Sequence, residues 1–186
     1  MRVFVAIDVP DGVQRALGEL IAKLEKACRG ARWARPEGMH VTLKFIGEAA
    51  PEKVEQIKSA LRAIHSPAPV DLRFRGSGFF PNPRHPRVFW AGIEASPNLT
   101  ELAESVERSL ESFGIPRESR MFQPHLTLAR FKSEDGLERL HQGIEQLGTL
   151  EFGATRATDF YLYQSVLKPR GAEYTRLAEF AFVKGA

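Results

Sequence analysis

The stretch that decides the fold is His40-Val41-Thr42-Leu43, and it occurs a second time as His125-Leu126-Thr127-Leu128. Each copy reads His-x-Thr-Leu and opens an apolar run. Successive side chains of a strand point to opposite faces, so the histidine and the threonine of each copy share one face. The two apolar residues share the other. We therefore expect each copy to be a strand with one buried face and one face that carries an imidazole and a hydroxyl.

The two copies belong to a longer internal repeat. The opening Arg2-Val3-Phe4-Val5-Ala6 matches Arg87-Val88-Phe89-Trp90-Ala91 at a separation of 85 residues, which is also the separation of His40 and His125. Both halves predict the order strand, helix, loop, His-x-Thr-Leu strand, helix. This shared separation favours a duplication with halves of approximately 1–84 and 85–186. Lobes related by a pseudo-two-fold axis would let the two His-Thr faces line one cleft.

Hydrophobic periodicity predicts an α+β fold. Apolar residues at helical spacing indicate four helices, of which the first ends near Gly30 and the last begins after Ser133 as its N-cap. Alternating or continuous apolar runs indicate strands at 2–8, 40–46, 70–79, 87–94, 125–131, 149–153, 156–165 and 173–183. We expect residues 1–186 to form a single bilobal domain.

Composition limits the class of protein. A chain of 186 residues is long enough for one well-buried domain. The 26 basic and 23 acidic residues give a net charge of +3, which permits an anionic substrate only where positive charge is locally concentrated. The single cysteine, Cys28, excludes an internal disulfide and a cysteine-based zinc site.

The sequence also carries an expectation about location. No apolar run approaches the roughly 20 residues needed to cross a bilayer. The first eight residues form a strand pattern and lack the apolar core and cleavage site of a signal peptide. We expect an intracellular, cytoplasmic protein that does not contact a membrane.

Two histidines facing one cleft suit acid–base chemistry. Histidine titrates near neutrality, so one imidazole can accept a proton from a nucleophile while the other protonates a leaving oxygen. Each such contribution is typically about 10²–10⁴-fold. The hydroxyls of Thr42 and Thr127 can donate hydrogen bonds to phosphate oxygens where charge develops. This set of groups predicts phosphoester cleavage, or its reversal.

The motifs allow two other interpretations. A single His-x-Thr-Leu strand is usually only structural, but a copy at a matched separation argues for a site. A zinc site on His40 and His125 would need a further ligand. The remaining histidines have no counterpart 85 residues away, and no carboxylate accompanies the motifs; they are His65, His85 and His141. We therefore predict neither a metal nor a cofactor.

The chain resembles the 2H phosphoesterases, specifically the LigT-like RNA 2′,3′-cyclic phosphodiesterases, also named 2′-5′ RNA ligases. The likeness covers essentially the whole chain, and beyond the segments quoted above it includes Phe80-Pro81-Asn82-Pro83-Arg84 and Tyr163-Gln164-Ser165. The resemblance implies a bilobal fold in which antiparallel sheets line a central cleft with helices outside. It also implies metal-free opening of a 2′,3′-cyclic phosphate at an RNA 3′ end to a 2′-phosphate.

The resemblance assigns roles that the residues alone leave open. It implies that His40 protonates the departing 3′ oxygen and that His125 activates water. Thr42 and Thr127 would hold the phosphate. From the residues alone, either histidine can be the acid.

Two basic residues beyond the motifs are further candidates for substrate binding. Strict alternation places Lys44 on the face of His40, where it would contact phosphate or RNA backbone or be a surface charge. Arg130 resembles a substrate-binding arginine of the family. Strict alternation nevertheless turns it away from His125, so that only a bulge or the end of the strand would bring it into the cleft.

The expected partner is RNA with a 2′,3′-cyclic phosphate end, and no protein partner is apparent. One alternative is a 2′-5′ RNA ligase, which runs the same chemistry backwards with a 5′-hydroxyl as nucleophile. Another is a non-catalytic module that binds RNA ends. The paired histidines argue against the second alternative, because arginines would serve better for binding alone.

Overall fold

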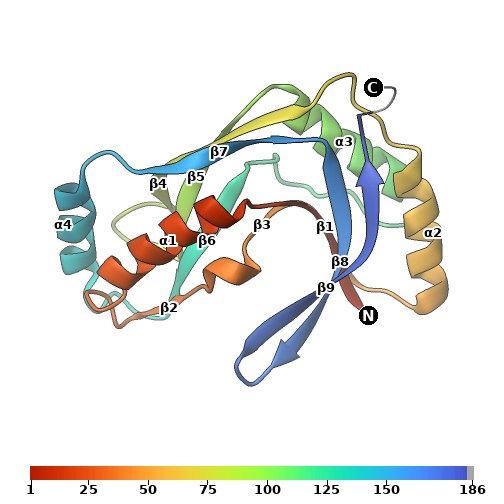
Figure 1. Ribbon diagram of the computed structural model, residues 1–186. Helices are drawn as coiled ribbons and strands as arrows, with labels where there is room; N and C mark the ends of the chain where they lie inside the picture. The colour runs from red at the N-terminus through yellow and green to blue at the C-terminus, as the bar shows by residue number, and fades with distance from the viewer. Residues whose placement is uncertain (184–186) are drawn as a thin grey trace.

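The computed structural model describes residues 1–183, which form two antiparallel sheets with four helices (Figure 1). The four-stranded sheet has the order β3-β1-β8-β9 and comprises β1 (Arg2–Asp8), β3 (His40–Glu48), β8 (Asp159–Lys168) and β9 (Gly171–Ala181). The five-stranded sheet has the order β2-β6-β5-β4-β7 and comprises β2 (Ala31–Trp33), β4 (Val70–Phe80), β5 (Val88–Ala95), β6 (His125–Phe131) and β7 (Glu151–Ala157). The predicted α+β class is confirmed.

Two helices cover each sheet. The helix α1 (Asp11–Leu24) packs against β7 and α4 (Leu137–Leu147), on the five-stranded sheet. The helix α3 (Asn98–Glu111) packs against β3 and α2 (Pro51–Arg62), which also contacts β9. Each is amphipathic, and α1 buries the apolar positions expected at 3.6-residue spacing, namely Val13, Leu17, Leu20, Ile21 and Leu24. Figure 1 shows the helices on the outside of the molecule.

The lobes of the fold are not the halves of the chain. The strands β8 and β9 come from the second half but complete the four-stranded sheet beside β1. The strands β2 and β4 come from the first half but lie in the five-stranded sheet. The helices are exchanged in the same way. The helix α1 follows β1 of the four-stranded sheet, yet it covers the five-stranded sheet. The two halves therefore interlock, and the division at residue 84 stays a prediction.

The register of the repeat differs by one residue from the sequence match. His40 pairs with Asp8 and His125 pairs with Gly92, so the partner strands are equivalent at a separation of 84 rather than 85. The direction in which the side chains point agrees with the separation of 84. Val5 and Phe89 are 84 residues apart, and both lie in the core with no exposed surface. The match was misplaced because β1 is buried on both faces, and a continuous apolar run carries no signal of which side chain faces inward.

Gly30 and Ser133 have roles other than the predicted caps. The helix α1 ends at Leu24, and Gly30 instead lies against the loop before α4, where its N–H donates to the Asp135 carbonyl at 3.2 Å. A Cβ on Gly30 would lie 2.5 Å from Ser133 Oγ, so the close approach requires glycine. The helix α4 begins after Gly136, whose φ is +80°.

Candidate active site

The two motif strands meet at one cleft. His40 and Thr42 on β3 and His125 and Thr127 on β6 all line it, and the cleft has a volume of about 2890 Å³. The strands β3 and β6 belong to different sheets but approach each other with Cα atoms within 8 Å. Both lie near the middle of the molecule in Figure 1. The cleft thus brings together side chains from positions far apart in the sequence.

Both motif histidines are held in the same way through Nδ1. His40 Nδ1 donates to the carbonyl of Gly38 at 3.0 Å, and His125 Nδ1 donates to the carbonyl of Gln123 at 2.7 Å. A carbonyl oxygen only accepts, so the proton of each neutral ring resides on Nδ1. Nε2 is left to accept a proton when the ring is neutral and to donate one when it is charged. Each ring is therefore prepared for proton transfer at Nε2.

The His40 ring is packed among aromatic side chains. Ring centroids lie at 4.4 Å for Tyr163, 5.1 Å for Tyr174 and 5.6 Å for Phe4. This burial is the largest influence and lowers the pKa of His40, while Asp8 and the Gly38 carbonyl each act in the opposite direction. The free protein therefore favours a neutral imidazole at this position.

A polar trio stands beside His40, and among residues 1–183 it has no counterpart beside His125. Tyr163 donates its hydroxyl proton to Asp8, and the Arg176 guanidinium donates to the same carboxylate. Burial, and next the hydrogen bond to Asp8, raise the pKa of Tyr163 to about 12. Gly92 lies opposite His125 where Asp8 lies opposite His40. Sequence reasoning assigned no role to the trio, because its members come from three separate strands and form no motif.

Among residues 1–183, His125 packs against fewer aromatic rings than His40 does. The Phe80 ring meets the imidazole edge to face, with centroids 5.2 Å apart. Phe80 also lines the cleft, at the end of β4. The two histidines are thus alike in how Nδ1 is held and different in what surrounds the ring.

A one-residue bulge follows the threonine of each motif. The β1–β3 ladder skips Leu43, and the β5–β6 ladder skips Leu128. An extra residue in a strand reverses the alternation of faces beyond it. Residues after the bulge therefore change sides relative to the strict pattern, and they do so at equivalent positions of both strands.

The bulge overturns the expectation for Lys44. The Nζ atom lies 2.8 Å from Glu107 Oε2 on α3 and donates to the Pro116 carbonyl at 2.7 Å. Only 5% of the Lys44 side chain is exposed, so its charge is committed to a buried ion pair. The prediction that Lys44 shares the face of His40 was wrong. Phe45 takes that face instead, and 53% of it is exposed.

The same bulge brings Arg130 to the cleft. Arg130 pairs with Val88, whereas Thr127 pairs with Trp90, two residues further along β5. Cross-strand partners share a face, and partners two residues apart lie on the same face, so Arg130 shares the face of Thr127. Arg130 is exposed and lines the cleft. The bulge that Arg130 needs in order to face the cleft is therefore present in β6.

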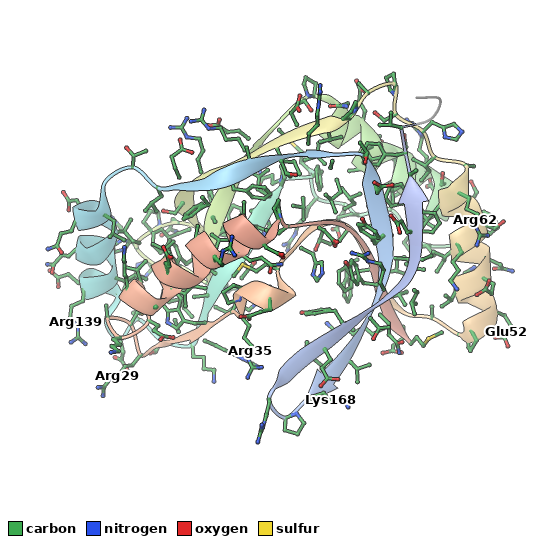
Figure 2. The ribbon with its side chains drawn as sticks, viewed as in Figure 1. Arg29, Arg35, Glu52, Arg62, Arg139 and Lys168 are labelled. Carbon is green, nitrogen blue, oxygen red and sulfur yellow. The ribbon has the colours of Figure 1, made fainter. Side chains whose placement is uncertain are left out.

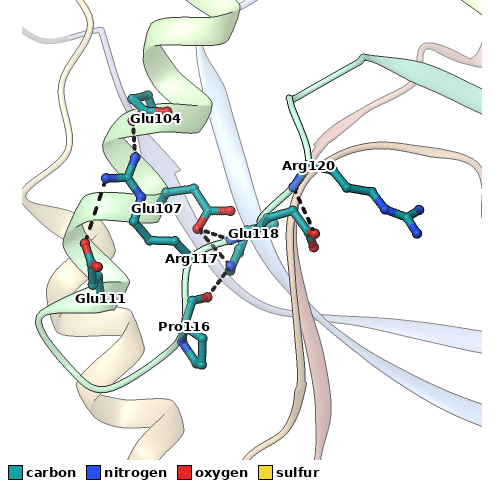
Figure 3. A network of polar contacts seen from close by, with 8 residues as sticks. Glu104, Glu107, Glu111, Pro116, Arg117, Glu118 and Arg120 are labelled. Atoms are coloured by element: carbon teal, nitrogen blue, oxygen red, sulfur yellow. Dashed lines mark hydrogen bonds and ion pairs between the residues drawn. The ribbon is translucent and has the colours of Figure 1, made fainter.

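A polar network anchors the segment that leads into β6. Figure 3 shows Arg117 between Glu104 and Glu111 of α3, and Glu107 close to Glu118. Glu107 Oε2 accepts from the Glu118 N–H at 3.2 Å as well as from Lys44. Because Lys44 follows the first motif and this segment precedes the second, the network ties both motif strands to α3.

Within residues 1–183, no group of three or more His, Cys, Asp or Glu side chains is arranged to hold a metal ion. In the same part of the chain, no helix has the length and apolar character needed to cross a membrane.

Two His-x-Thr strands, one from each sheet, line one cleft. The model of the LigT-like phosphoesterase family matches residues 7–90 and 93–174. The chain therefore belongs to the LigT-like phosphoesterases, as the resemblance of its motifs predicted.

Known relatives match over almost the full length. A protein of Thermotoga maritima named RNA 2′,3′-cyclic phosphodiesterase is 36% identical over 187 residues, covering 100% of this chain and 97% of its own. A protein of the same name from Archaeoglobus fulgidus is 35% identical, covering 97% and 99%. The crystal structure of LigT from E. coli with 3′-AMP superposes with a TM-score of 0.79 at 26% identity, covering 97% of each chain.

Proposed function

We propose that this protein opens 2′,3′-cyclic phosphates at RNA 3′ ends to 2′-phosphomonoesters, by two-histidine acid–base catalysis without a metal. The observation that carries the proposal is the pair of Nδ1-anchored imidazoles that line one cleft, each with a threonine on the same strand face. The names of the Thermotoga and Archaeoglobus relatives support the substrate. The E. coli LigT structure with 3′-AMP supports a nucleotide in the cleft.

The chemistry is one displacement at phosphorus. His125 Nε2 accepts a proton from water as the water oxygen bonds to phosphorus. The bond from phosphorus to the 3′ oxygen breaks, and His40 Nε2 gives its proton to that oxygen. The products are a 2′-phosphate and a 3′-hydroxyl. The two rings have then exchanged protonation states, and solvent restores them. The choice of His40 as acid follows the family.

The remaining cleft groups hold the phosphate. Thr42 and Thr127 each lie two residues from a motif histidine on the same face, so their hydroxyls can donate to the non-bridging oxygens. Arg130 lies further along the Thr127 face and adds a charge-assisted donor. Such preplaced donors act most strongly on the charge that develops in the transition state.

His40 must be protonated to act as the acid, although burial lowers its pKa in the free protein. An anionic phosphate beside the ring favours the charged form and raises the pKa again. Substrate binding therefore favours the protonated form of His40, which is the form that acts as the acid. In the free protein the lowered pKa favours the neutral ring near neutral pH, so the proton would arrive with the substrate or after it.

Product analysis tests the reaction. The protein is incubated, with EDTA present, with an oligonucleotide that ends in a 2′,3′-cyclic phosphate, and the terminus formed is identified. We expect a 2′-phosphate at a rate that EDTA does not change. A 3′-phosphate would reverse the leaving group, loss of turnover with EDTA would require a metal, and absence of turnover would refute the enzyme.

Two variants test the roles of the histidines. We expect His40→Ala and His125→Ala each to lose at least about 100-fold in turnover, with product affinity changed much less. A substrate with sulfur in place of the bridging 3′ oxygen separates acid from base, because a thiolate leaves without protonation. It should restore His40→Ala and leave His125→Ala inactive. Rescue of His125→Ala alone would exchange the two roles.

A further inference from the structure

Two arginines stand directly opposite each other at the rim of the cleft. Arg32 on β2 is the cross-strand partner of Arg130 on β6. Both are exposed and both line the cleft, whereas Ala129, the residue before Arg130 on β6, is buried in the core. The strand β2 is the edge strand of its sheet, so Arg32 lies one strand further out than Arg130.

This pair is not neutralised by the protein. Within residues 1–183, neither Arg32 nor Arg130 has a carboxylate oxygen within 4.0 Å. Like charges directly opposite on neighbouring strands destabilise a sheet. An anion that lies between or beside the two guanidinium groups would offset this repulsion, and arginine is well suited to bind phosphate.

We propose that Arg32 binds a second phosphate of the RNA, namely the phosphodiester on the 5′ side of the terminal nucleotide. The proposal rests on the proposed function, in which Arg130 helps to hold the reacting phosphate. Neighbouring strands are about 4.8 Å apart, and the long arginine side chains reach further, so adjoining phosphates can each meet one guanidinium. Arg32 then makes the site favour an oligonucleotide over a single nucleotide.

Three substrates with the same terminal cyclic phosphate test this site. The first is a nucleoside 2′,3′-cyclic phosphate, and the second is a dinucleotide with a normal phosphodiester. The third is the same dinucleotide with an uncharged methylphosphonate at the internal linkage. We expect kcat/KM of the wild-type protein to be about 10- to 100-fold higher for the phosphodiester than for the methylphosphonate.

Arg32→Gln should remove most of this preference for the charged linkage. The matched control is Arg29→Gln, which makes the same change of charge at an exposed arginine outside the cleft. Figure 2 labels Arg29 at the outer end of the molecule near α4. The control should keep the full preference.

The outcomes separate this proposal from the proposed function. Failure of wild-type protein on all three substrates would refute the activity itself. If the wild type turns them over but Arg32→Gln keeps its preference, the second site is wrong. An equal loss on all three substrates would also overturn it, because Arg32 would then act at the reacting phosphate.

A stability measurement shows that the effect is not a folding defect. Because Arg32→Gln removes a positive charge directly opposite Arg130, its Tm at low salt should equal or exceed that of the wild-type protein. A lower Tm would mean that Arg32 supports the fold and would overturn the proposal.

Discussion

The two motif histidines are bound alike at Nδ1 but lie in different surroundings. His40 packs against Phe4, Tyr163 and Tyr174. His125 packs against Phe80, which is the last residue of β4. The His-x-Thr spacing predicted which groups share a face, and the cleft contains both pairs. It carried no information on the rings around them, because those rings come from β1, β4, β8 and β9.

The first prediction concerns the titration of His40. Burial lowers its pKa below the ordinary 6.5, so in the free protein it should lose its proton at a lower pH than a histidine in water. The neutral ring then favours the folded state above pH 6.5, and this contribution is lost as the pH falls through the lowered pKa. An NMR titration of the ring carbons, assigned with a His40 variant, measures it. A midpoint at or above 6.5 would contradict the role of burial.

The second prediction concerns the polar trio. Tyr163→Phe keeps the ring that packs on His40 but removes the hydrogen bond to Asp8. We expect the free energy of unfolding to fall by about 1–2 kcal/mol, measured by urea denaturation. Tyr161→Phe is the control, since within residues 1–183 its hydroxyl makes no hydrogen bond, and it should change stability by less than about 0.5 kcal/mol. Equal effects of the two changes would contradict the claim that the hydrogen bond from Tyr163 to Asp8 stabilises the fold.

At the level of single elements, the bulge after each threonine decides which side chains enter the cleft. Strict alternation assigned Lys44 to the face of His40 and Arg130 to the face opposite His125, and the bulge reverses both facings. A local apolar pattern cannot reveal an extra residue, because Leu43-Lys44-Phe45 alternates acceptably in either register. A comparison of the two copies carried a weak signal, since the position of Lys44 holds Ala129 in the second strand and favours a buried site.

The third prediction tests the buried ion pair that joins β3 to α3. Removing one partner leaves the other charge buried without compensation, so Lys44→Met or Glu107→Leu alone should destabilise the fold by about 3–5 kcal/mol. The double variant replaces both charges with apolar groups and should recover much of that loss. Thermal or urea unfolding of the four proteins completes the cycle.

Additive losses in that cycle would show that Lys44 and Glu107 act independently. Lys53→Met is a suitable control, because it alters a half-buried lysine that donates to the Phe113 carbonyl near the same segment. It should change the free energy of unfolding far less than Lys44→Met.

At the scale of the whole molecule, the two halves interlock, so strands of both halves build the cleft. Each sheet contains strands from both halves, and each half sends its first helix to the other sheet. Hydrophobic periodicity predicted the helices because it reports which face is buried. It does not report against which sheet, so the exchange of helices and of β4 and β8 was out of its reach.

The fourth prediction follows from that exchange. Residues 1–84 lack the β8 partner of β1 and the β5 partner of β4, so this fragment should not fold alone, and neither should 85–186. Mixed together, the fragments should restore native circular dichroism and dispersed amide resonances. A full chain cut at a protease site inserted in the exposed loop between β4 and β5 should stay assembled, because every ladder remains available. A folded, monomeric 1–84 fragment would show that the first half is a lobe in its own right and that the interlocking is not needed for stability.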